Sequence, residues 1–198
     1  MTKNNIDKKA ENKWKKANNC YENYQNFIKG KTDRFELTLI DLLYISNFKG
    51  GNATIGEKEQ EVNEKLLAYS EKLRKISKTF KSKKLSQLTD PEIKKLVGYI
   101  ESVSDLTEKE NTKIDGFGPS YLSALLSAYF PRLIPILDRR VLLNLKVVDK
   151  NDLNSQDQVK KIGKFYGELI QKIAKLAKKN TLKTIRNIDR EIFIKKIE

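Results

Sequence analysis

The sequence contains no histidine and a single cysteine, Cys20, among its 198 residues. An internal disulfide is therefore excluded, and almost nothing is left from which a zinc or iron–sulfur site could be built. No apolar run approaches the roughly 20 residues that a membrane-spanning helix needs. Residues 1–16 are polar and rich in lysine, unlike the apolar segment of a secretory signal. These absences predict a cytoplasmic protein with no membrane association and no metal bound by side chains.

Acidic residues are scarce relative to basic ones, and the formal net charge is +14 at pH 7. A basic domain of this size attracts polyanions, such as nucleic acid, an acidic lipid surface or an acidic protein. Residues 160–198 contribute strongly, because Lys and Arg far outnumber Asp and Glu there. Two alternatives remain open: codon bias placed the lysines on the surface, or the C-terminal charges are the solvated side of an amphipathic helix.

Apolar residues recur at spacings of three and four along most of the chain, which is the helical period. No alternating pattern of useful length indicates a strand, and no linker rich in Pro, Gly or Ser divides the chain. We therefore expect an all-α fold in a single domain, 1–198. The expected helices cover residues 1–31, 37–45, 56–80, 90–100, 119–130, 139–145, 158–179 and a short segment near 185–193, with loops at 46–52 and 105–113.

Gly116 and Gly118 stand one residue apart and allow the positive φ angles that a very tight helix-to-helix turn requires. Phe117 between them is suited to anchoring such a hairpin in the core. Pro119 fits the first position of a helix, where its missing amide hydrogen costs nothing. The free backbone amides at that helix start would attract a phosphate. The alternative is an ordinary packed hairpin in which the glycines serve only packing.

An aspartate follows this helix at the start of another one. Pro131 and Pro135 force an extended stretch, which brings Asp138 to the beginning of the next helix. Asp138 is a good helix cap on any interpretation. Arg139 and Arg140 sit in the first turn, where the helix dipole disfavours cations. We expect the Asp138 carboxylate, bound phosphates or both to offset this cost.

This part of the chain resembles the helix-hairpin-helix DNA glycosylase superfamily. It has, in order, a glycine hairpin, a helix of apolar and small residues, a proline-interrupted stretch and an Asp before another helix. The resemblance is most specific over Ile114–Leu145 and implies a compact helical glycosylase-like fold. Its helix-hairpin-helix core would span about 91–145, followed by basic helices at 158–198. The whole chain also resembles a group of bacterial glycosylase-fold proteins to which no activity is attached, and Arg186–Asp189 is part of that likeness.

The resemblance also implies a chemistry. Asp138 would be the catalytic carboxylate that helps to cleave the N-glycosidic bond of a base flipped out of the duplex. Bifunctional members carry a Schiff-base lysine two residues after the second hairpin glycine, where this chain has Ser120. We therefore expect a monofunctional enzyme in which Asp138 activates water or stabilises the oxocarbenium-like sugar. The hairpin would hold DNA backbone, and in this superfamily a monovalent cation is often bound to the hairpin carbonyls. The DNA-binding residues of this region would be Gly116, Phe117, Gly118, Ser120, Arg139 and Arg140.

A second acid or base is not obvious from the sequence. Asp41 lies about one turn before the 46–52 loop, roughly where adenine-mispair glycosylases hold a glutamate; the alternative is a solvated helix residue. An Asn and aromatic loop can wedge into the gap that a flipped base leaves, and the alternative is a loop with helix-capping asparagines. The candidates for this DNA contact are Asn47, Phe48, Lys49 and Asn52.

Three functions are consistent with these features. The first is a monofunctional glycosylase that acts as a monomer on a damaged, mispaired or modified base in double-stranded DNA, and the retained Asp138 favours it. The second is a catalytically inactive nucleic-acid-binding module of the same fold, favoured by the lack of a clear second acid or base. The third is a basic adaptor for protein, which would lack the salt-dependent DNA affinity of the other two. We expect Arg186 and Asp189 to form an internal ion pair that holds the last helix.

Overall fold

The computed structural model describes residues 6–51 and 54–197, and these contain eight α-helices and no β-strand. The all-α prediction is therefore confirmed for the described residues. None of their helices is both long enough and apolar enough to cross a membrane. The helices are α1 (Lys8–Gly30), α2 (Leu39–Phe48), α3 (Glu59–Phe80), α4 (Asp90–Ser104), α5 (Pro119–Tyr129), α6 (Arg139–Asn144), α7 (Tyr166–Lys179) and α8 (Ile185–Phe193).

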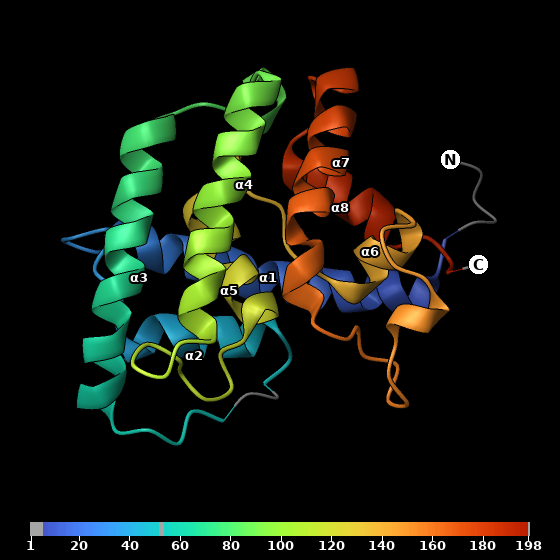
Figure 1. Ribbon diagram of the computed structural model, residues 1–198. Helices are drawn as coiled ribbons and strands as arrows, with labels where there is room; N and C mark the ends of the chain where they lie inside the picture. The colour runs from blue at the N-terminus through green and yellow to red at the C-terminus, as the bar shows by residue number, and fades with distance from the viewer. Residues whose placement is uncertain (1–5, 52–53, 198) are drawn as a thin grey trace.

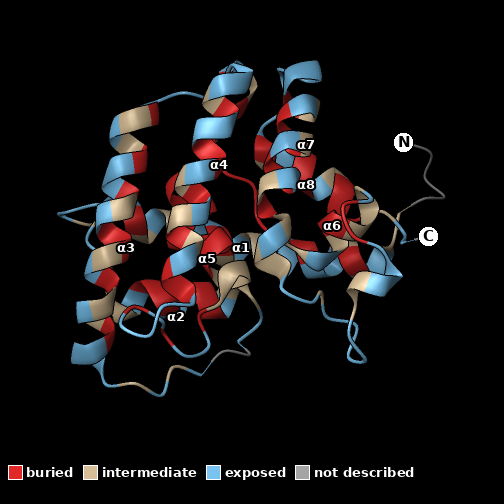
Figure 2. Cartoon of the chain, viewed as in Figure 1, coloured by how far each residue is buried: buried red, intermediate tan, exposed pale blue. Residues whose placement is uncertain are grey.

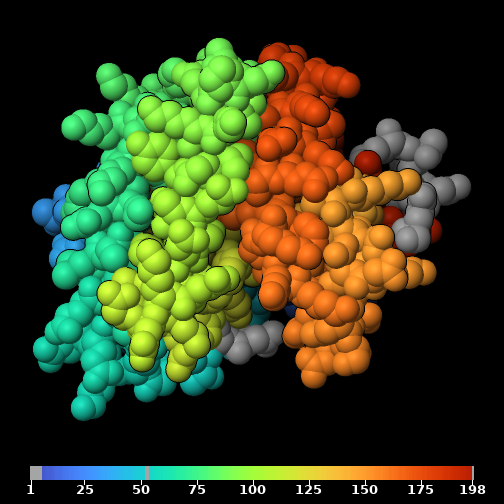
Figure 3. All heavy atoms as spheres, in the orientation of Figure 1, coloured from blue at the N-terminus to red at the C-terminus, as the bar shows by residue number. Residues whose placement is uncertain are grey.

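Three long helices, α3, α4 and α7, stand side by side, and α1 crosses behind them (Figure 1). Helix α5 lies in the middle and is buried over most of its length, in contact with both α1 and α2 (Figure 2). From this side α3, α4, α7 and the segment 146–165 form the surface, and little of α1 is visible (Figure 3). The first and last helices also contact each other, so the two ends of the described chain lie together.

Local signals account for several helix boundaries. Thr89 caps α4 by accepting from the Glu92 amide, while Glu92 accepts from the Thr89 amide, which is a reciprocal capping box. Pro119 is the first residue of α5, as the sequence predicts. The predicted apolar face of α3, from Val62 to Phe80, is fully buried. These faces bury enough apolar area to stabilise helices that would be marginal in isolation.

Several predicted helix boundaries are wrong: α1 begins at Lys8 rather than at residue 1, α3 begins at Glu59 rather than at 56, and α4 ends at Ser104 rather than at 100. Helix α2 continues to Phe48, so residues 46–48 are helical rather than loop, because Phe48 packs its ring 5.6 Å from the ring of Tyr21. Positive φ angles at Gly50 and Gly51 then end that segment. Helix α7 begins only at Tyr166, after a left-handed residue and a short 3-10 turn, whereas the apolar spacing predicts a helix from residue 158.

The glycine hairpin also differs from its prediction. Helix α4 ends at Ser104, and a 3-10 turn and a loop separate it from Gly116, so the glycines do not join two helices directly. Gly116 does have a positive φ of 79°, whereas Gly118 is extended with φ −85°. Phe117 is buried against Tyr69, with ring centroids 5.9 Å apart, and anchors the loop as expected. The turn is thus a loop-to-helix junction at the start of α5.

Candidate functional site

A cavity of about 280 Å³ lies where α1, the end of α2, the start of α6 and α8 meet. Its volume is close to the lower end of the roughly 300–1,000 Å³ range of small-molecule sites. Most of its lining is apolar or aromatic, with charged groups at a few points. The lining residues are Lys13, Trp14, Lys16, Ala17, Cys20, Asn47, Phe48, Lys49, Gly50, Ile136, Asp138, Val141, Arg186, Asp189 and Phe193.

An arginine stacked on aromatic rings forms one part of the cavity wall. The guanidinium carbon of Arg186 lies 3.8 Å from the ring centroid of Trp14 and 4.6 Å from that of Tyr21. Such cation–π contacts orient a guanidinium as well as stabilise it. Its Nε donates to Asn18 at 3.2 Å, but its buried Nη2 has no hydrogen-bond partner. The cavity wall therefore contains a fixed cation that keeps one buried donor unused.

Asp138 reaches the cavity from the start of α6. It is half-buried, and one carboxylate oxygen accepts the backbone N–H of Arg140 at 2.8 Å, so it caps the helix as the sequence predicts. The cap fixes the direction of the carboxyl group. The structure thus combines the capping role with a place in the cavity wall.

Asp189, one helical turn after Arg186 on α8, is the second carboxyl group of the cavity. It is only 2% exposed, and neither of its oxygens accepts a hydrogen bond of normal geometry. Burial raises its pKa to about 7, although the nearby charge of Arg186 and the approach of the Ile136 amide both lower it. The expected closed ion pair between Arg186 and Asp189 is not formed, since each keeps buried polar atoms without partners.

Lys49 brings an amine to the same cavity from the residue that follows α2. Burial lowers the pKa of this amine; Asp138 opposes that effect, while the positive charges of Lys13 and Arg186 add to it. The residues of the 46–52 segment that were predicted to contact DNA therefore lie partly in this cavity. Asn47, Phe48 and Lys49 line the cavity beside Asp138, whereas Asn52 lies outside the described residues.

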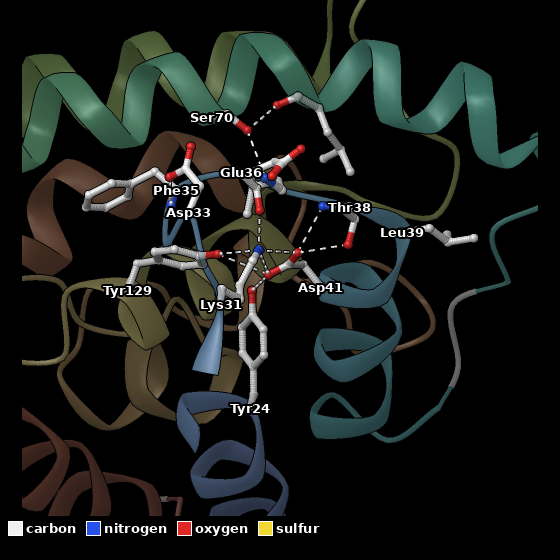
Figure 4. Close-up of polar contacts among 12 residues, drawn as sticks. Tyr24, Lys31, Asp33, Phe35, Glu36, Thr38, Leu39, Asp41, Ser70 and Tyr129 are labelled. Carbon is white, nitrogen blue, oxygen red and sulfur yellow. Dashed lines mark hydrogen bonds and ion pairs between the residues drawn. The ribbon is translucent and has the colours of Figure 1, made fainter. Parts of the chain in front are cut away.

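Asp41, the predicted second acid, lies away from this cavity in a buried network (Figure 4). Lys31 Nζ is 2.8 Å from one carboxylate oxygen, and the hydroxyls of Tyr24 and Tyr129 donate to the other at 2.9 and 3.1 Å. The Thr38 amide donates to the same carboxylate at 2.9 Å. Asp41 is fully buried rather than solvated, and these contacts fix α2 against α1 and α5.

The two arginines after Asp138 have partners other than those predicted. Arg140 forms an ion pair with Asp7 at 2.9 Å and donates to the carbonyls of Phe193 and Lys195. Arg139 is exposed and donates to the carbonyl of Asp157. These contacts tie the start of α6 to both ends of the described chain. Arg140 is thus occupied by structural bonds that a phosphate contact would have to replace.

The hairpin residues lie outside the cavity lining. Gly118 is partly exposed and nothing lies within 4 Å of the position of an added Cβ, so a ligand can approach its backbone closely. Its carbonyl accepts the amides of Tyr121 and Leu122. Ser120 donates its hydroxyl to the carbonyl of Leu137 at 3.2 Å, which links the start of α5 to the residue before Asp138.

Sequence reasoning missed Trp14, Phe193 and the role of Asp189 in the cavity. Trp14 and Phe193 pack 5.3 Å apart between ring centroids, and only the contact of α1 with α8 brings them together. A signal for Asp189 was present, because this charged residue interrupts the apolar face of α8 formed by residues such as Ile185 and Ile192. A carboxyl group at such a position is buried by the fold and needs a partner or a function.

A larger hollow of about 680 Å³ lies between residues 143–152 and 195–197, but it contains neither Asp138 nor the unsatisfied groups of α8. Among the described residues, no group of three or more His, Cys, Asp or Glu is placed to hold a metal ion. The cavity between α1 and α8 is therefore the best candidate site. A scan against protein-family models and searches of curated proteins and of solved structures found no match to this chain.

Proposed function

We propose that the protein is a monofunctional DNA N-glycosylase that hydrolyses the bond between a damaged, mispaired or modified base and its sugar. The observation that carries the proposal is the position of Asp138, a carboxyl group fixed in the wall of a cavity that is also lined by the rings of Trp14 and Phe48. Enzymes that act on a base of duplex DNA bind it flipped out in a snug pocket. A carboxylate beside the sugar stabilises the positive charge that develops at its anomeric carbon.

Charge and chemistry around the cavity are consistent with this proposal. The net charge of +14 favours DNA as the polyanion, and Lys13, Lys16 and Lys49 place part of that charge at the cavity. The open backbone at Gly118 offers a second place for a phosphate. Ser120 supplies no amine, so strand cleavage by a Schiff base is not expected from that position.

The second candidate is a catalytically inactive module that binds DNA through the same surface. The observation favouring it is that Asp138 already caps α6, so its presence has a structural reason. Both candidates predict DNA affinity that falls steeply with salt, because neutralised phosphates release counterions. Only the glycosylase predicts that Asp138 is needed for a chemical change in the DNA.

The test is an excision assay on end-labelled duplexes that carry damaged, mispaired and modified bases, with and without alkali. We expect alkali-dependent cleavage of at least one duplex by the wild type and its loss, on the order of 10³-fold, in Asp138→Asn. The matched control is Asp149→Asn, the same change at a similar cap, since Asp149 accepts the Asn151 amide at 2.7 Å. DNA binding by filter retention at two salt concentrations completes the comparison.

The possible results separate the candidates. Salt-sensitive binding without cleavage of any duplex would leave the inactive module. Equal activity of Asp138→Asn and the wild type would remove Asp138 from the mechanism. Cleavage without alkali would contradict the monofunctional assignment and point to Lys49, whose pKa is lowered by burial in the cavity. Borohydride trapping, compared between the wild type and Lys49→Gln, would then identify the amine.

A further inference from the structure

Asp189 has no assigned role in the proposed reaction, although it shares the cavity with Asp138. It is 2% exposed and both of its carboxylate oxygens are buried; the Ile136 amide approaches them and lowers the pKa, but it does not form a hydrogen bond of normal geometry. Burial of a polar group without partners is costly, and native proteins keep few such groups. Because Asp189 belongs to the cavity wall, a molecule that binds in the cavity and shifts its side chain slightly can supply the missing partner.

Charged and titratable groups reach Asp189 from the helices around it. Arg186 on the same helix lowers its pKa, and Asp138 at the start of α6 raises it. Tyr21 on α1 and Tyr166 on α7 also interact with it electrostatically. Burial raises the pKa of both tyrosines, that of Tyr21 to about 12, so these hydroxyls stay neutral near Asp189.

The balance of these effects leaves Asp189 able to hold a proton near neutral pH. Burial is the largest effect on its pKa and outweighs the opposing charge of Arg186. Lys49, from the end of α2, and Lys13, from α1, face the same cavity with positive charge. Two carboxyl groups of one site that differ in their surroundings are suited to different roles, one as an acid and one as an electrostatic stabiliser.

We propose that Asp189 is the hydrogen-bond and proton donor to a ring nitrogen of the base held in this cavity, an inference that rests on the proposed glycosylase function. The O–H bond of Asp189 breaks and an N–H bond forms on the base. The bond between the sugar carbon and the base breaks, and its electron pair stays on the base. Asp138 stabilises the cationic sugar carbon, which takes the oxygen of a water molecule. The proton released by that water passes to solvent, from which Asp189 is protonated again.

This assignment defines the class of base that depends on Asp189. A neutral base leaves poorly and needs a proton on its ring nitrogen, so its excision requires the donor. A base that already carries a positive charge, such as a ring-alkylated purine, leaves without that proton. Excision of the cationic class should therefore proceed without Asp189, provided that the cavity still accepts the base.

The first experiment compares excision of a neutral and a ring-alkylated base between pH 5.5 and 8.5. We expect the wild-type rate on the neutral base to fall as pH rises through about 7. Asp189→Asn should be slower by on the order of 10² or more on the neutral base, with no such pH dependence, and within a few-fold of wild type on the alkylated base. Glu191→Gln, an isosteric change on the same helix, is the matched control and should behave as wild type.

The second experiment needs no catalysis, because Trp14 is the single tryptophan of the chain and lines the cavity. Its fluorescence reports the binding of free adenine to the intact protein. We expect wild-type affinity to fall as pH rises through about 7. Asp189→Asn keeps an N–H donor and should bind equally at all these pH values, whereas Asp189→Leu should bind at least tenfold more weakly. Circular dichroism checks that both variants are folded.

Each result decides one of the two proposals. If Asp189→Asn excises neutral bases as fast as the wild type does, the proposed role of Asp189 is overturned and the glycosylase proposal stands. If the wild type excises no base but binds adenine with the expected pH dependence, the glycosylase proposal alone has failed. Adenine binding that does not change with pH, or that Asp189→Leu retains, would overturn the donor role in either case.

Discussion

Asp189 lowers the stability of the folded protein at neutral and alkaline pH. Its pKa is 3.8 in the unfolded chain and about 7 in the folded protein, so the folded state is favoured most at low pH, where the carboxyl group is protonated in both states. This contribution to stability is fully present below pH 3.8 and is lost as the pH rises through about 7. Each pKa unit corresponds to about 1.4 kcal/mol. A fully buried carboxyl group retained at this cost, in a cavity wall, is typical of residues kept for function rather than for folding.

We therefore expect Asp189→Asn to be more stable than the wild type, and increasingly so as pH rises. The gain in free energy of unfolding should be larger at pH 8.5 than at pH 5 by roughly 2–3 kcal/mol, because the wild type must ionise a buried group at the higher pH. Urea denaturation at the two pH values measures it. A variant that is less stable than the wild type at both would show that Asp189 is a structural residue.

The buried pair of Lys31 and Asp41 has the opposite effect on stability. Lys31 is 10% exposed and Asp41 is fully buried, so loss of either partner leaves an uncompensated charge in the core. We expect Lys31→Met and Asp41→Leu each to lower the free energy of unfolding by about 3–5 kcal/mol. The double variant should lose less than the sum of the two single losses, because neither charge remains, although the donors from Tyr24, Tyr129 and Thr38 still lack their acceptor.

Thermal and urea denaturation of the four proteins in this cycle provide the measurement. Lys183→Ala, which breaks the exposed pair with Glu191, is the control and should cost about 0–1 kcal/mol. Full additivity of the two single losses would contradict the assignment of Lys31 and Asp41 to one structural network. An Asp41→Leu protein that stays stable but loses excision activity would instead favour the sequence-based catalytic role.

At the scale of single elements, the two hairpin glycines have different requirements. Gly116 has a φ of 79°, which an L-residue with a side chain adopts at a cost, whereas Gly118 has a φ of −85° and open space around it. We expect Gly116→Ala to destabilise the protein by about 1–2 kcal/mol. Gly118→Ala should change stability by less than about 0.5 kcal/mol, as measured by urea denaturation.

The same pair of variants tests the proposed phosphate contact at Gly118. If DNA backbone approaches the start of α5 closely, the added methyl group of Gly118→Ala should weaken DNA binding although the fold is unchanged. Unaltered affinity in that variant would place the DNA contact elsewhere, on the lysines around the cavity.

Most helices could be predicted because their signals are local. The apolar face of α3 and the capping box of α4 each lie within one helix, and both appear as expected. The boundaries at Phe48 and Tyr166 could not be predicted, because packing decides them. Phe48 packs against Tyr21, and Gly163 lies so close to Pro119 that an added Cβ would be 3.1 Å from the proline ring. Tertiary contacts override local propensity at such places.

At the scale of the whole molecule, the candidate site depends on contacts that no local pattern records. The resemblance to the glycosylase superfamily predicted Asp138 and the segment from Asn47 to Lys49 as site residues, and the fold places them in one cavity. Trp14 was expected only as part of an amphipathic helix, and Arg186 and Asp189 as an internal ion pair. Their shared cavity follows from the packing of α1 on α8, across almost the full length of the chain.

That packing has a kinetic consequence. Ile6 pairs with Lys195, the Asp7 amide donates to the Ile194 carbonyl at 2.8 Å, and Arg190 pairs with Glu11 at 3.0 Å. Contacts between such distant residues form only after a long loop has closed, which makes them slow to form compared with neighbouring helices. The cavity is therefore expected to be completed late in folding and to open first when either end frays. A molecule bound in the cavity would contact both ends of the chain. Its dissociation and the separation of the two ends would then be the same event and would have the same rate.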